Sequence, residues 1–132
     1  MIHSQVTGDS GFFDHPAVVL EITGHVAKIC LGTSFGGRHI DAKYHERARR
    51  ERLRYLLIQH GGYDAHDNLP VLHLKDRSRC MRRATYVNLE ATYSIETEHL
   101  EVYTGSGSSQ ETVALDDVSL ANVKKAAMCF DS

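Results

Sequence analysis

The side chains best suited to chemistry in this chain are those of His15, Thr33 and Ser34. Histidine gains or loses a proton near neutral pH, so His15 could act as a general acid or base. The hydroxyl groups of Thr33 and Ser34 could hold an anionic oxygen of a substrate. Each residue also has a structural interpretation: His15 could stack on Pro16 or Phe13, and the hydroxyl groups could bond to the backbone where a strand ends.

Two apolar runs, 16–22 and 26–31, must position these groups. Both runs are rich in β-branched residues, and a short turn at Thr23–Gly24 separates them, which is typical of a β-hairpin. In an antiparallel hairpin the start of the first strand lies beside the end of the second. The pattern therefore predicts that His15 lies next to the two hydroxyl groups.

Charge is distributed unevenly along the 132 residues, although the formal net charge is only −2. Residues 38–83 hold twelve basic and six acidic side chains, a net charge of +6, whereas residues 84–132 have a net charge of −6. Most of the central cations are arginines, which can bind a phosphate or carboxylate through two parallel hydrogen bonds. This favours a polyanionic partner, with RNA or DNA the obvious kind. The candidate nucleic-acid-binding residues are Arg38, Arg47, Arg49, Arg50, Arg52, Arg54, Arg79 and Arg82.

The elements expected around these residues are short. The pattern predicts a charged helix over 41–54, strands over 55–59, 69–74 and 85–89, an extended piece over 93–96 and a C-terminal helix over 118–130. The first helix could simply be a solvated face with ion pairs such as Glu46 to Arg50. The last helix should begin at a cap on Asp117 or Ser119 and pack through Leu120, Val123, Ala127 and Phe130.

These elements indicate a mainly β fold with α-helices. Five or six short strands with one insertion helix and one terminal helix suit an SH3-like antiparallel small barrel. At this length we expect a single domain over 1–132, with a lead-in over 1–10 and the barrel and its C-terminal helix over 11–130.

Composition favours a cytoplasmic protein. No apolar run approaches the roughly 18 to 20 residues of a membrane span, and residues 1–10 lack the basic and apolar parts of a signal peptide. The three cysteines are odd in number and far apart, which favours reduced thiols over a disulfide framework. They are Cys30, Cys80 and Cys129, of which Cys30 should be a small buried residue in mid-strand.

Other signals predict neither a metal nor a cofactor. None of the nine histidines forms a ligand pair such as His-x-His. The Gly-x-Ser-x-Gly pattern at 32–36 occurs in α/β-hydrolases, but their elbow needs a large parallel sheet that this hairpin-patterned chain cannot form. Tyr44, Tyr55 and Tyr63 lie near the basic segment and could either stack on bases or belong to the core.

Several of these features follow one another in a set order along the chain. A loop ending in a basic residue and a proline leads into the apolar strand 17–22, and the next strand ends in Thr33–Ser34. The short strands 55–59 and 85–89, an Ile-x-x-x-x-Leu segment at 95–100 and the terminal helix 118–130 follow. In this order the chain resembles the PemK/MazF-like toxin superfamily over about residues 11–130, as a divergent member.

The resemblance implies a metal-independent endoribonuclease that cleaves single-stranded RNA, is a homodimer and binds an acidic antitoxin. It places the catalytic group at His15, Thr33 and Ser34, with His15 standing where the family has an arginine. A histidine there could still move a proton, or the site could be inactive. The alternative is a non-catalytic binding module that recognises nucleic acid or an acidic protein partner through its arginine-rich central segment.

Overall fold

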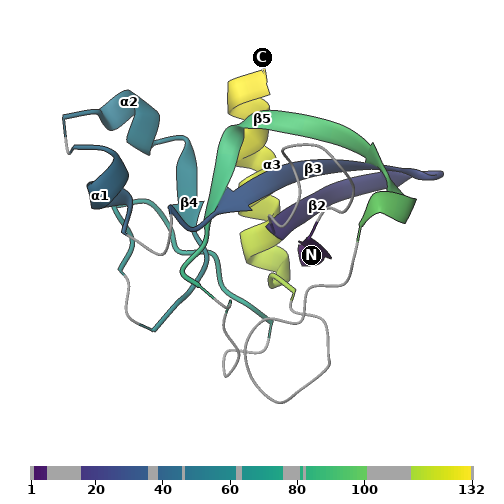
Figure 1. Cartoon of the computed structure of the whole chain (residues 1–132), viewed down its shortest axis with the longest axis horizontal. Helices are drawn as coiled ribbons and strands as arrows, with labels where there is room; N and C mark the ends of the chain where they lie inside the picture. Colours follow the sequence, from purple (N-terminus) through teal and green to yellow (C-terminus); the bar gives the residue numbers. More distant parts are fainter. Residues whose placement is uncertain are drawn as a thin grey trace.

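The protein is built around a five-stranded antiparallel sheet, with the long C-terminal helix packed against it and two short helices to one side (Figure 1). The computed structural model describes residues 2–5, 16–35, 39–45, 47–61, 64–75, 81, 83–100 and 114–131. Its strands are β1 (Ile2–Gln5), β2 (Pro16–Thr23), β3 (Val26–Thr33), β4 (Tyr55–Leu57) and β5 (Tyr86–Glu96), in the order β1-β2-β3-β5-β4. The helices are α1 (Ile40–Lys43), α2 (Arg49–Arg52), the 3-10 helix η1 (Thr97–His99) and α3 (Asp117–Asp131).

The predicted hairpin is confirmed. β2 and β3 pair antiparallel from Ala17 opposite Leu31 to Thr23 opposite Val26. Gly24 turns the chain with a φ of 61°, a conformation that glycine adopts without steric cost. Cys30 is fully buried in mid-strand, as expected. The register places the start of β2 beside the end of β3.

β5 connects the two parts of the sheet. Its first residues lie between β4 and β3, with Tyr86 opposite both Leu57 and Thr33, and its last residues pair with β3 alone, with Glu96 opposite Val26. Between these stretches the register with β3 shifts, and the ribbon rises beside β4 before turning along β3 (Figure 1). The strand expected at 85–89 and the extended piece at 93–96 are therefore one bent strand.

The sheet of the described residues does not close into a barrel, so the predicted SH3-like small barrel is met only in its antiparallel strands and helices. Among the described residues β1 and β4 lie at opposite edges of the sheet, and no backbone pairing joins them. The outer edge of β4 is occupied instead, because the amide of Leu72 donates to the carbonyl of Leu57 over 2.8 Å. The strand expected over 69–74 is reduced to isolated bridges at Leu72 and Leu74. The mainly antiparallel β class with helices is confirmed.

The C-terminal helix packs on the sheet as predicted. Val123 and Ala127 of α3 are buried in one core cluster with Val18, Leu56 and Leu89. The helix is capped one residue earlier than expected: the carboxylate of Asp116 accepts from the amide of Ser119 over 2.7 Å. Leu120 is half-buried against the same cluster, while the side chain of Phe130 lies outside the described residues. Among the described residues, no helix has both the length and the apolar character needed to cross a membrane.

The prediction of a single helix over 41–54 was wrong, because the helical conformation is interrupted at Tyr44. Tyr44 is extended, with φ −129° and ψ 125°, and it separates α1 from α2. In a continuous helix its carbonyl would accept from the amide of Ala48. Here the Nη1 group of Arg52 donates to that carbonyl over 2.9 Å, and the Ala48 amide donates to His45. A tertiary contact thus overrides good helix propensity.

Candidate functional site

The end of β3 places Thr33 and Ser34 beside the start of β5. Thr33 lies opposite Tyr86, and both Thr33 and Ser34 are half-buried. The Oγ1 atom of Thr33 accepts a hydrogen bond from the amide of Phe35 over 3.3 Å. Phe35 has a φ of 50°, which turns the chain out of the strand. The hydroxyl group of Thr33 therefore has the backbone role that its position at a strand end suggested.

His15 lies outside the described residues, as do Arg38, Arg79 and Arg82. The next residue, Pro16, is the first of β2 and lies against Gly32. A Cβ atom on Gly32 would be 3.4 Å from the Pro16 carbonyl oxygen and only 2.7 Å from the Thr85 Cγ2 atom. Glycine thus permits the close approach of β2 and β5 on either side of β3, directly before Thr33.

An aromatic cluster fixes α1 next to this strand end. The ring of Phe35 lies 5.1 Å from that of Tyr55, 5.2 Å from that of Tyr86 and 6.2 Å from that of Tyr44. The Oη atom of Tyr86 accepts from the amide of Ile40, the first residue of α1, over 3.2 Å. Burial, with a hydrogen bond to Tyr44, raises the pKa of Tyr55 to about 12. Tyr55 therefore belongs to the core rather than to a base-stacking surface.

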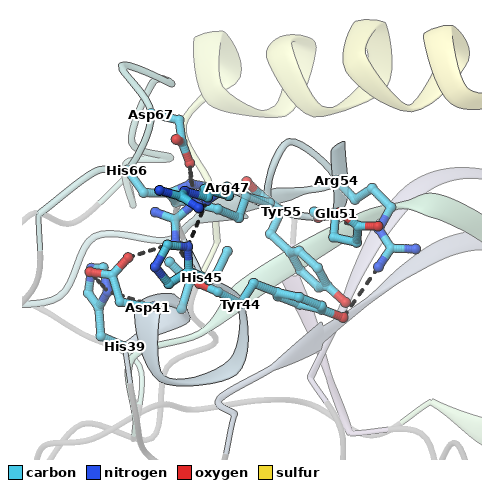
Figure 2. A network of polar contacts seen from close by, with 12 residues as sticks. His39, Asp41, Tyr44, His45, Arg47, Glu51, Arg54, Tyr55, His66 and Asp67 are labelled. Atoms are coloured by element: carbon cyan, nitrogen blue, oxygen red, sulfur yellow. Dashed lines mark hydrogen bonds and ion pairs between the residues drawn. The ribbon is translucent and has the colours of Figure 1, made fainter. Parts of the chain in front are cut away.

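Arg52 is the centre of an ionic network that joins α1, α2 and the loop at 66–67. Figure 2 shows the other members of this network, Asp41, His66 and Asp67. The side chain of Arg52 is only 5% exposed. The Nη1 group donates to Asp41 over 2.7 Å, and the Nε group donates to Asp67 over 2.9 Å. Arg52 is therefore removed from the candidate nucleic-acid surface, because these donors are used inside the fold.

His66 completes this network from the other side. Its Nδ1 atom lies 2.7 Å from the Asp67 carboxylate, and its Nε2 atom donates to the carbonyl of Tyr55 over 2.9 Å. Hydrogen bonding to His66, aided by the charge and hydrogen bond of Arg52, lowers the pKa of Asp67. The loop is tied to β4 and α2 by these contacts, so it supports the position of both helices.

The side chain of Arg54 is partly buried in the fold and partly exposed at the surface. Its Nη1 group pairs with Glu90 of β5, and its Nη2 group donates to the Tyr44 hydroxyl over 3.3 Å. The guanidinium carbon lies 5.9 Å from the Tyr44 ring centre and 5.7 Å from that of Tyr55. About a quarter of the side chain is exposed. Arg54 can contact a ligand only at the rim of this region.

Arg47, Arg49 and Arg50 are exposed on α2 and the turn before it. No acidic side chain of the described part of the chain forms an ion pair with them, and Glu46, the expected partner of Arg50, lies outside that part. These three guanidinium groups are therefore available to an anionic partner. We call them the arginine face.

The chain matches no known protein family, no curated protein and no solved structure. The function must therefore be argued from the arrangement of the residues. The structure brings Thr33 and Ser34 together with the aromatic cluster and α1. The arginine face lies on α2, which Arg52 joins to α1. The sequence did not predict the network of Arg52, Asp67 and His66. Asp67 and Asn68 are residue types that favour turns, and both have a positive φ here, but a turn alone does not indicate that Asp67 pairs with Arg52.

An acidic group marks the opposite end of the sheet. Glu96 ends β5, and Glu98 and His99 belong to η1, which lies far from α1 and α2 in Figure 1. A hydrogen bond with Glu98 and the charge of that carboxylate raise the pKa of Glu96. Ligand atoms of these three exposed residues lie within 4.8 Å of one another. All three are exposed, and exposed acidic groups are common on proteins without a metal ion.

Proposed function

We propose that this chain binds single-stranded RNA through its arginine face and cleaves it without a metal, as a divergent member of the PemK/MazF-like toxin superfamily. The observation that carries the proposal is the state of the three guanidinium groups of Arg47, Arg49 and Arg50. They are exposed and unpaired with the described acidic groups, and the bonds of Arg52 to Asp41 and Asp67 hold their helix against α1 and the loop at 66–67. Such groups neutralise phosphates at the surface.

The bent strand β5 supports the proposed SH3-like fold. Small β-barrels turn corners with strands that bend and pair on both sides of the bend. β5 pairs with β4 at Tyr86–Asn88, and it pairs with β3 on both sides of its bend, at Tyr86–Val87 and at Thr92–Glu96.

His15, Thr33 and Ser34 are the proposed catalytic residues. The approach of Pro16 to Gly32 supports a position for His15 near Thr33, where it would take the proton of a ribose 2′-hydroxyl or donate one to the leaving oxygen. The Thr33 oxygen accepts from the Phe35 amide, so its own proton can be donated to a phosphate oxygen. A mechanism built on the 2′-hydroxyl uses no metal.

RNA affinity should fall steeply between about 50 and 200 mM salt, because counterions are released when cations meet phosphates. Replacing Arg47, Arg49 and Arg50 with alanine should flatten the slope of log K against log salt by about two units for single strands. Fluorescence anisotropy with a mixed-sequence RNA measures both. As a control, alanine at Lys28, Lys124 and Lys125 removes the same charge elsewhere and should leave the slope nearly unchanged. Equal slopes for the two triple variants would contradict the arginine face as the binding surface.

His15→Ala should lower the cleavage rate by roughly 10² to 10⁴, the range for loss of a general acid or base. Thr33→Val should cost less, since that hydroxyl is assigned only to hold a phosphate. The assay incubates RNA with protein and chelator and looks for fragments that end in cyclic phosphate or 3′-phosphate. If His15→Ala and wild type give the same background, catalysis is excluded.

A non-catalytic binding module is the second candidate. The Thr33 hydroxyl already has a backbone partner, and no described cation contacts Thr33 or Ser34. In that case the arginine face would hold nucleic acid or an acidic protein without cleavage. RNA binding with no fragments would identify this function, and affinity for acidic peptide alone would point to a protein partner.

A further inference from the structure

A groove of about 420 Å³ separates α3 from β4 and the segments on either side of it. Leu56 and Leu89 form its bottom, since they are only 3% and 2% exposed. Half-buried Leu53 and Leu69 form one wall with exposed Pro70. This volume lies within the range of small-molecule sites, and a hollow of aliphatic side chains open to water favours an apolar occupant.

The opposite wall of the groove is polar at one place only. It consists of one stripe of α3, in which Asn122 and Lys125 lie three residues apart and so project side by side, with Ala126 and the thiol of Cys129 next to them. Lys125 is exposed and Asn122 is half-buried. No acidic side chain of the described residues lines the groove. The hollow thus offers an apolar surface and, at its edge, one ammonium group beside one amide.

We propose that this groove binds a small amphipathic carboxylate with an unbranched aliphatic chain. The chain lies on Leu56 and Leu89, and the carboxylate accepts hydrogen bonds from the Lys125 ammonium and the Asn122 amide. The charge of the groove selects this head group, because a cationic or neutral head would leave Lys125 without a counter-charge. This site is separate from the arginine face and does not depend on RNA binding or cleavage.

Decanoate, below the concentration at which it forms micelles, is a suitable probe. Titration calorimetry should show one site, and the methyl resonances of Leu56 and Leu89 should shift in NMR spectra. Octanoate should bind roughly tenfold more weakly, because two fewer methylene groups leave water. Binding without these methyl shifts, or only with micelles, would overturn the proposal, as would no binding.

The adjacent residues Lys124 and Lys125 of α3 provide a matched pair of variants. Lys125→Glu should weaken decanoate binding at least tenfold and should favour decylamine instead. Lys124→Glu makes the same charge change but lies against Leu20 and Glu21 on the other side of α3, so it should leave both ligands nearly unaffected. An equal effect of the two variants would show non-specific attraction and overturn the proposed site.

A third variant tests the apolar surface without changing charge. Ala126→Phe should fill the groove and abolish decanoate binding, and its thermal midpoint shows whether the fold is kept. If that variant fails to fold, Ala126→Leu provides a smaller change with the same expected direction. Undiminished binding by a folded variant of either kind would place decanoate elsewhere and overturn the proposal.

Discussion

Replacing Val123 with aspartate should lower the free energy of unfolding by several kcal/mol, a large part of the roughly 5 to 15 kcal/mol that stabilises a typical domain. Val123 is fully buried between α3 and the sheet, among Val18, Leu56 and Leu89. No cation of the described residues belongs to that cluster, so the new carboxylate would be buried without a partner. Urea unfolding followed by circular dichroism measures the loss.

The same substitution at Val118 is the control for this prediction. Val118 is on the same helix but is 71% exposed, and it lies in the first turn, where a negative charge is favourable. Val118→Asp should therefore change the free energy of unfolding by no more than about 0.5 kcal/mol. If both variants unfold at the same urea concentration, α3 is not docked on the sheet.

Replacing Arg52 with methionine should cost about 3 to 5 kcal/mol, the usual effect of removing one partner of a buried ion pair. Asp67, whose side chain is 15% exposed, would lose its guanidinium partner, and the Tyr44 carbonyl would lose its donor. Most of the loss should come from Asp67, since Asp41 is largely exposed. Chemical unfolding at neutral pH is the measurement.

Two further variants separate the network from the loss of a single charge. Arg49→Met removes an exposed arginine of the same helix and should cost no more than about 0.5 kcal/mol. Combining Arg52→Met with Asp67→Asn should recover part of the loss, since no unpaired carboxylate remains. If Arg52→Met were as stable as Arg49→Met, the network would have no role in stability.

Local patterns were enough to predict the hairpin and the terminal helix. β2 and β3 are neighbours in the chain, and a glycine turn with β-branched flanks sets their pairing. In α3 the spacing of Leu120, Val123 and Ala127 marks the buried face without any knowledge of the partner. Both elements depend on residues close together in sequence, which explains why they could be recognised.

Contacts between distant residues explain what the patterns missed. The break at Tyr44 depends on Arg52, and the position of Arg52 depends on Asp67, which no local pattern links to the helix. The ion pairs of Arg52 likewise remove it from the surface, although Arg52 and Arg50 lie in the same charged segment of the sequence. The sequence could therefore predict that this segment carries many arginines. It could not predict which of their side chains are exposed to a ligand and which are used inside the fold.

The bent strand β5 also has a consequence for folding kinetics. Thr33 pairs with Tyr86, so about fifty residues must be closed into a loop before these two strands meet, and β4 joins the sheet only through the same strand. Helical bundles with local contacts fold fastest, and chains with such separated pairings belong to the slower end of the range. During synthesis, the hairpin of β2 and β3 therefore has no strand beside β3 until residues 86–96 have left the ribosome. Until then β4, which follows α2 in the chain, also has no strand of the sheet to pair with.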